Sequence, residues 1–139
     1  MAADDELERI KEQKKAEMAD QMNDEESGDD VRSAPNEPIH VEGESHLEEV
    51  TSSYDVVLVD FYADWCGPCK MLEPIVESLA ADSEAAVAKV DVDANQPLAA
   101  QYQVQGVPTM LLFADGEPVE RIVGVRDQSH LQGLIQQYS

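Results

Sequence analysis

The chain contains two cysteines, Cys66 and Cys69, and only two residues separate them. They follow a continuous apolar run at residues 56–62, broken by one aspartate, which predicts a buried strand. Apolar residues at helical spacing follow the pair. A Cys-x-x-Cys between a strand and a helix, without a signal peptide, indicates a thiol–disulfide redox site. We therefore expect this chain to make and break one small disulfide.

The position of the pair at the start of a helix predicts different roles for the two thiols. The first helical turn has unsatisfied amide donors and a partial positive charge, which stabilise a thiolate. We expect a lowered pKa for Cys66, which makes it the attacking thiol. Pro68 fixes the first turn, and Gly67 lets a substrate chain approach closely. Cys69, expected to be more buried, would then attack the mixed disulfide on Cys66 and release the reduced substrate.

Asp60 is the third candidate, because it is a carboxylate within the apolar run, six residues before Cys66. Burial would raise its pKa, and from the adjoining strand it could exchange a proton with Cys69. The alternative is a strand-end aspartate that reaches solvent or a backbone amide. Lys89 on the next predicted strand could tune Asp60, although most lysines are solvated.

Two other uses of the cysteine pair are weaker. A zinc site needs about four ligands, and the histidines at 40, 46 and 130 do not supply zinc-finger spacing. A structural disulfide closing so short a loop would constrain little. We expect no metal and no bound cofactor.

The elements that must position these residues have the order β-α-β-α-β-α-β-β-α. Strands are predicted at residues 39–41, 56–62, 86–92, 109–113 and 119–123, and helices at about 45–51, 68–81, 95–102 and 127–138. Ser45 and Glu48 have the spacing of a capping box, and Asp127 is expected to cap the last helix. Asp115-Gly116 predicts a hairpin turn, and Pro118 suits an edge strand. This order predicts an α/β fold, with a mixed sheet of about five strands flanked on both faces by about four helices.

Composition bounds the remaining possibilities. A chain of 139 residues can hold one domain with a substantial core. Its 30 acidic and 9 basic residues give a net charge of -21, which disfavours nucleic acid and anionic membrane surfaces as partners. No apolar segment is long enough to span a membrane. Without a signal peptide, we expect a cytoplasmic protein whose two thiols rest reduced.

The acidity extends over the whole chain. Residues 1–37 have a net charge of -8 and residues 38–139 a net charge of -13. At 1 M salt the screening length is about 3 Å, so dispersed carboxylates no longer repel one another and keep the surface hydrated. This pattern favours a halophilic protein over an ordinary acidic one. Residues 1–37 are expected to be a mostly disordered extension with nascent helix, or alternatively a docking helix for a partner.

The motif Trp-Cys-Gly-Pro-Cys-Lys at residues 65–70, preceded by Val59-Asp60-Phe61, closely resembles the active site of the thioredoxin family. The resemblance extends from about residue 39 to 138, through Pro74, the Lys89-Val90-Asp91-Val92-Asp93 segment, Gly106-Val107-Pro108-Thr109, residues 113–116 and Gly124. It implies the thioredoxin fold for residues 38–139. A lowered pKa of the first cysteine is already a known property of this family.

The resemblance also implies further site residues. It implies a cis Val107–Pro108 peptide whose backbone pairs with the substrate, and a buried pair, Asp60 and Lys89, that governs the proton of Cys69. An apolar rim that docks partner proteins is implied at Trp65, Gly67, Pro68, Val107, Pro108, Gly124 and Val125. Tyr62 stands where another tryptophan is frequent, and this changes a hydrogen-bond partner.

These features together predict a protein-disulfide reductase that cycles between a Cys66–Cys69 disulfide and a dithiol. Its partners would be disulfide-containing client proteins and a separate thioredoxin reductase as electron donor, because the sequence has no nucleotide or flavin fingerprint. We expect a monomer. A disulfide isomerase or oxidase is the enzymatic alternative, although Gly-Pro between the cysteines resembles reductases. A partner-binding module with incidental thiol chemistry is the second alternative.

Overall fold

The computed structural model describes residues 34–139. The predicted extension therefore lies, up to residue 33, outside the described residues. The element order is β-α-β-α-β-α-β-β-α, as predicted. The elements are β1 (Ile39–His40), α2 (Glu44–Ser53), β2 (Val56–Tyr62), α3 (Gly67–Asp82), β3 (Ala86–Asp91), α4 (Gln96–Gln101), β4 (Thr109–Ala114), β5 (Glu117–Val123) and α5 (Gln128–Tyr138).

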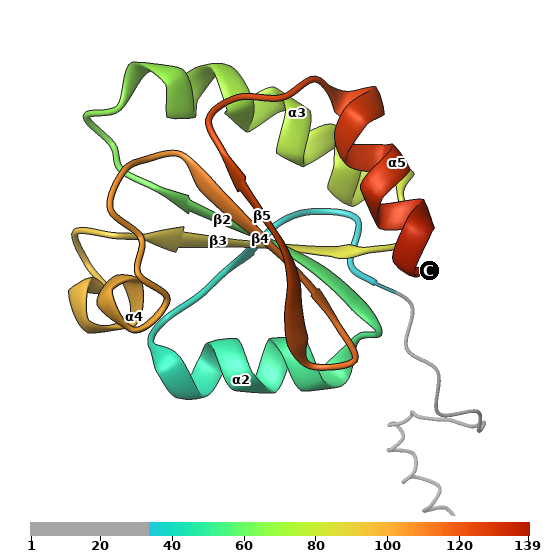
Figure 1. The fold of residues 1–139 in the computed structure, drawn as a ribbon, viewed down its shortest axis with the longest axis horizontal. Coiled ribbons are helices and arrows are strands. Elements are labelled where there is room, and N and C mark those ends of the chain that lie inside the picture. The colour runs from blue at the N-terminus through green and yellow to red at the C-terminus, as the bar shows by residue number, and fades with distance from the viewer. Residues whose placement is uncertain (1–33) are drawn as a thin grey trace, which may run out of the picture. The chain divides into compact units, whose positions relative to one another are not determined.

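The strands form one five-stranded mixed sheet in the order β1-β3-β2-β4-β5. The pairs β1–β3 and β2–β3 are parallel, whereas β4 and β5 add an antiparallel edge. Helices α3 and α5 lie on one face of the sheet, and α2 and α4 lie on the other (Figure 1). The predicted α/β architecture with helices on both faces is thus confirmed.

Strand β2 is the central strand of the sheet, and its side chains are buried on both faces. Val56 and Leu58 join the core under α3 and α5, whereas Val57, Val59 and Phe61 join the core under α2 and α4. Side chains alternate between the faces of a strand, so Asp60 lies on the α3 and α5 face. This alternation places the carboxylate among the apolar residues beneath the helix that carries the cysteines.

The hairpin between β4 and β5 forms at Asp115-Gly116, as predicted. Both residues have positive φ, 54° for Asp115 and 86° for Gly116, which is the backbone of a tight two-residue hairpin turn. Strand β5 pairs only with β4 and so lies at the edge of the sheet, where Pro118 needs no donor.

One predicted helix start is wrong. Helix α2 begins at Glu44 with Gly43 as its N-cap, and the N-cap residue supplies no side-chain capping bond. His46 Nδ1 instead accepts a 3.0 Å bond from the Glu42 amide just before the helix. The expected capping box of Ser45 and Glu48 is therefore not formed, because the helix starts before Ser45. The cap on α5 is confirmed, since the Asp127 carboxylate accepts a bond of 2.9 Å from the His130 amide. No helix among residues 34–139 is long and apolar enough to cross a membrane.

Candidate active site

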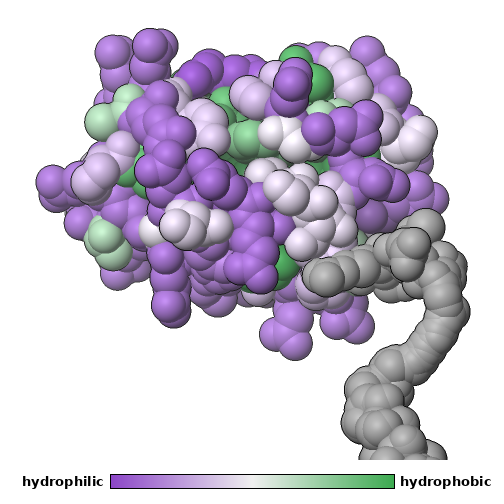
Figure 2. Space-filling model, turned by 90° about the horizontal axis from the view of Figure 1, so that it is seen from below, coloured by the Kyte–Doolittle hydropathy of each residue, from purple (hydrophilic) through white to green (hydrophobic). Residues whose placement is uncertain are grey.

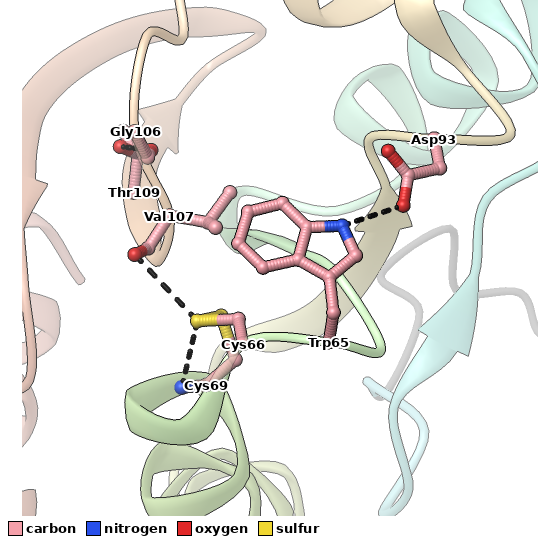
Figure 3. Close-up of a disulfide and its surroundings, with 7 residues drawn as sticks. All are labelled: Trp65, Cys66, Cys69, Asp93, Gly106, Val107 and Thr109. Atoms are coloured by element: carbon pink, nitrogen blue, oxygen red, sulfur yellow. Dashed lines mark hydrogen bonds between the residues drawn. A yellow bond between two sulfur atoms is a disulfide. The ribbon is translucent and has the colours of Figure 1, made fainter.

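A disulfide joins Cys66 and Cys69 at the N-terminal end of α3 (Figure 3). Cys66 is the N-cap of the helix, and its Sγ accepts a hydrogen bond from the Cys69 amide at 3.2 Å. Pro68 lies in the first turn, where its missing N–H leaves no bond unmade. The helix therefore directs a backbone donor at the sulfur of Cys66, an arrangement that favours negative charge on that atom.

Burial does not distinguish the two cysteines. Both are 4% exposed in the disulfide form, so the prediction that Cys69 is the more buried residue is wrong here. Their surroundings differ instead. Cys66 Sγ lies 3.6 Å from the Val107 carbonyl oxygen, whereas Cys69 lines a cavity of about 210 Å³. Cys66 Sγ has no proton in the disulfide, so its approach to the Val107 oxygen is a contact and not a hydrogen bond. After reduction, the Cys66 thiol can donate its S–H to that oxygen.

Several residues of the expected docking rim lie around the disulfide. Trp65 is 71% exposed, and its indole nitrogen donates a 2.9 Å bond to Asp93 (Figure 3). Gly67 and Pro68 are exposed at the helix start. The structure thus brings the first part of the rim together from the β2–α3 connection.

The second part of the rim comes from the loops on either side of β4 and β5. The Val107–Pro108 peptide is cis, as the resemblance implied. The Gly124 amide donates a 2.9 Å bond to the Pro108 carbonyl, and Gly124 has φ +92°, a conformation that favours glycine. Val125 is half-buried and packs against the core under α3 and α5.

Asp60 is 1% exposed, and its Oδ1 has no hydrogen-bond partner. Burial raises the pKa of Asp60 from 3.8 to about 7, an effect that Lys89 partly offsets and Glu73 reinforces. The alternative of a strand-end aspartate that reaches solvent is therefore wrong. An acid with a pKa near neutrality can both accept and donate a proton at physiological pH.

Lys89 is buried rather than solvated, with 7% exposure. It is the Cα partner of Asp60 on β3, yet its ammonium nitrogen lies 3.3 Å from Glu73 Oε2. The same nitrogen lies 4.5 Å from the centroid of the Tyr62 ring. Glu73 and Tyr62 therefore hold the cation that the resemblance assigns to Asp60.

Two residues at the site were not predicted from the sequence. Glu73 follows Cys69 by four residues, so helical spacing places it on the same side of α3, and this signal could have found it. Asp93 was noted only as part of the resemblance, and its contact with Trp65 depends on tertiary structure. Among residues 34–139, no group of three or more histidine, cysteine or acidic side chains could hold a metal ion.

Known proteins share this arrangement. A family model described as Thioredoxin matches residues 37–137. The solved structure of a mutant thioredoxin from Halobacterium salinarum NRC-1 is 60% identical, with a TM-score of 0.75, and the match covers 77% of this chain and 95% of that one. Thioredoxin from Chlamydia caviae is 49% identical over 85 residues, which are 60% of this chain and 83% of the relative. The bifunctional thioredoxin reductase/thioredoxin of Mycobacterium leprae is 47% identical over 95 residues, 67% of this chain but 21% of that longer protein.

A mixed sheet that presents a Cys-x-x-Cys disulfide at the start of a helix defines a thiol–disulfide oxidoreductase. The family model covers most of the described residues, and so the chain belongs to the thioredoxin family. Its activity is that of a protein-disulfide reductase with a redox-active Cys66–Cys69 pair. Proteins of this family reduce disulfide substrates and are themselves reduced by thioredoxin reductase.

Proposed function

We propose that Cys66 attacks the disulfide of a client protein, that Cys69 resolves the mixed disulfide, and that Asp60 handles the proton of Cys69. The observation that carries this proposal is the 3.2 Å hydrogen bond from the Cys69 amide to Cys66 Sγ. This bond and the helix N-terminus favour the thiolate at Cys66 over the thiolate at Cys69.

The cycle balances as two exchanges. The Cys66 thiolate bonds to one client sulfur, and the other client sulfur leaves as a thiolate that takes a proton from water. Cys69 then loses its proton to the Asp60 carboxylate and attacks Cys66 Sγ, which releases the second client thiolate. Lys89 tunes the charge of Asp60 in this step. The client disulfide thereby gains two electrons, and the dithiol that supplied them is oxidised to the Cys66–Cys69 disulfide.

Client proteins are proposed to dock on the rim around the disulfide. The exposed indole of Trp65 and the exposed Gly67 and Pro68 offer apolar surface beside Cys66. The Val107 carbonyl, 3.6 Å from Cys66 Sγ, is placed to accept a hydrogen bond from an extended client chain. Pro108, Gly124 and Val125 complete this rim in the proposal.

We propose a separate thioredoxin reductase as the electron donor and a monomer as the working form. The reductase is supported by the Mycobacterium leprae relative, whose name joins a thioredoxin reductase and a thioredoxin in one protein. The proposed site needs no second copy, because the two cysteines, Asp60 and Lys89 all come from one chain.

A high-salt setting is proposed from the acidic surface of the domain. A cytoplasmic location is proposed from the sequence. The side of the domain that carries α2 is mostly hydrophilic (Figure 2), and the carboxylates of Glu44, Glu48 and Glu49 are exposed on that helix. The similar structure from Halobacterium salinarum supports the halophilic part of this proposal. Residues 1–37 are proposed to be an acidic extension outside the thioredoxin domain. Ala34 packs against the core under α2 and α4. A shortened chain that tests the role of the extension should therefore keep Ala34 and all residues after it.

Reduction of insulin disulfides by the purified full-length chain tests the proposed roles. Cys66→Ser should abolish reduction, whereas Cys69→Ser should accumulate a mixed disulfide with the client that gel electrophoresis without reductant detects. Equal and partial losses in both variants would contradict the assignment. A measured redox potential at the oxidising end of the range would instead favour the isomerase or oxidase.

A further inference from the structure

Asp60 is the one buried carboxylate among residues 34–139, where every other acidic residue is exposed or half-buried. A buried carboxylate without a partner is unfavourable in its ionised form, so a cation brought to Asp60 would change its protonation. Lys89 is the cation in register with it on the neighbouring strand. Whether Lys89 contacts Asp60 therefore decides how readily Asp60 exchanges a proton.

The Lys89 ammonium is held by other groups. It donates a 3.3 Å hydrogen bond to Glu73 Oε2 and lies over the face of the Tyr62 ring. A buried ammonium needs such partners, since it has lost most of its water. The Glu73 side chain is 49% exposed, whereas the Lys89 side chain is 8% exposed, so the ion pair joins a buried ammonium to a carboxylate at the surface of the domain. Asp60 Oδ1 is left without a hydrogen-bond partner.

The Glu73–Lys89 pair also forms a wall between two surface cavities. The cavity of about 210 Å³ is lined by Cys69, Glu73 and Lys89, whereas a wider cavity of about 430 Å³ is lined by the same ion pair together with His40 and Glu77. The smaller cavity can hold several water molecules beside Cys69. Glu73 thus lines the same cavity as Cys69 and the Lys89 cation.

We propose that Glu73 is a positioning residue for thiol–disulfide exchange, which holds the Lys89 ammonium away from Asp60 and so leaves Asp60 free to take and return the proton of Cys69. The inference rests on the proposed role of Asp60. Without Glu73, the Lys89 side chain can turn to Asp60 and hold it as a carboxylate. Such a carboxylate accepts the proton of Cys69 in the resolving step but returns it poorly when a reductase dithiol restores Cys69.

The ionisable groups that line the smaller cavity come from three elements. Helix α3 contributes Cys69, Lys70 and Glu73, strand β3 contributes Lys89, and the end of β2 contributes Tyr62 and the nearby Asp64. Of these groups, Lys89 and Glu73 act on the charge of Asp60. His40 on β1 is the Cα partner of Lys89 and faces the wider cavity. From β4 and α5 the same face receives apolar residues such as Met110 and Leu131. Glu73 is thus the acidic group that contacts the cation.

Carboxyl ¹³C NMR titration of Asp60 in the oxidised full-length protein tests this inference. Glu73→Gln should lower the titration midpoint of Asp60 by about one pH unit, which is tenfold in the acid dissociation constant. Glu77→Gln is the matched control, because Glu77 lies one turn further along α3 and lines the wider cavity. Its effect should be within a few tenths of a unit. Equal shifts in both variants, or no shift in Glu73→Gln, would overturn the inference.

A double-mutant cycle separates positioning from direct repulsion between the two carboxylates. Lys89→Met alone should raise the midpoint, since the cation is lost. If Glu73 acts through Lys89, then Glu73→Gln in the Lys89→Met background should shift the midpoint by less than half as much as in the original chain. Equal shifts in the two backgrounds would overturn the positioning role.

A rate measurement distinguishes failure of this inference from failure of the proposed function. Asp60→Asn should slow insulin reduction, and Glu73→Gln should move the pH profile of the rate to lower pH in parallel with the NMR midpoint. An unchanged rate in Asp60→Asn would refute the proton role of Asp60. A slow Asp60→Asn variant together with an unmoved pH profile in Glu73→Gln would refute only the role of Glu73.

Discussion

The indole nitrogen of Trp65 donates a 2.9 Å hydrogen bond to Oδ2 of Asp93, which joins the residue before the disulfide to the turn that follows β3. Trp65 is mostly exposed, so packing alone leaves its ring free to rotate. Asp93 therefore fixes the direction of the largest apolar side chain beside Cys66.

Removal of this bond should weaken client binding. In Asp93→Ala the indole can sample other rotamers, and we expect KM for a protein disulfide to rise roughly two- to fivefold with little change in kcat. Steady-state kinetics with insulin measures both constants. Glu49→Ala, which removes another exposed charge, on α2, is the control. A similar rise in KM for the control would attribute the effect to charge alone.

Asp60 should make folding less favourable as the pH rises. The folded protein keeps the Asp60 proton up to about pH 7, whereas the unfolded chain loses it near the ordinary pKa of 3.8. The contribution of Asp60 to stability is therefore complete below pH 3.8 and is lost as the pH approaches 7, by roughly 4 kcal/mol in total.

Urea unfolding of the original chain and of Asp60→Asn measures this effect. Asn does not titrate, so the stability of the variant relative to the original chain should grow by roughly 4 kcal/mol between about pH 4 and pH 8. Comparison of the two proteins cancels the titration of the surface carboxylates. A stability difference that stays constant with pH would show that Asp60 has an ordinary pKa.

The acidic surface should make the fold dependent on salt. Residues 38–139 have a net charge of -13, and at millimolar ionic strength these charges repel one another over tens of ångströms. We expect the melting temperature at neutral pH to fall by several degrees or more between molar and millimolar KCl. Thermal unfolding followed by circular dichroism measures it, and an unchanged melting temperature argues against adaptation to salt.

The starts of α2 and α5, for which the sequence predicts capping side chains alike, should respond differently to mutation. Asp127→Ala removes the carboxylate that accepts the His130 amide and should destabilise the fold by about 1 kcal/mol. Ser45→Ala should change stability by a few tenths of a kcal/mol, because Ser45 caps nothing in α2. Chemical unfolding measures the free energy of unfolding of both variants. Equal losses of stability would show that Ser45 caps α2 after all, as the sequence predicts.

Much of the fold could be predicted because local signals agree with the tertiary structure. The apolar run of β2 needs cover on both faces, and Asp115-Gly116 permits the positive φ angles of the hairpin. The start of α2 could not be predicted in the same way. Gly43 occupies the N-cap with φ +97°, and the side-chain bond at this helix end is the one that His46 accepts from the Glu42 amide. The spacing of Ser45 and Glu48 does not indicate either feature.

The site was predicted less completely than the fold. Cys66 and Cys69 follow from their spacing and Asp60 from its apolar neighbours, since these signals are local. The partner of Lys89 could not be predicted from local signals. The strand register places Asp60 beside Lys89, whereas the ion pair forms with Glu73, whose side chain extends from α3. Which of the two carboxylates contacts the ammonium depends on side-chain conformation and solvation, and the spacing of residues in the sequence does not determine either.

The two edge strands of the sheet, β1 and β5, have a consequence for aggregation at high salt. Strand β1 has two residues, and β5 carries Pro118 together with the charged Glu117, Glu120 and Arg121. Neither edge strand offers a long, uncharged row of free backbone groups for another copy to extend. Salt concentrations that strengthen apolar attraction between molecules should therefore leave this protein dispersed, without strand-by-strand aggregation.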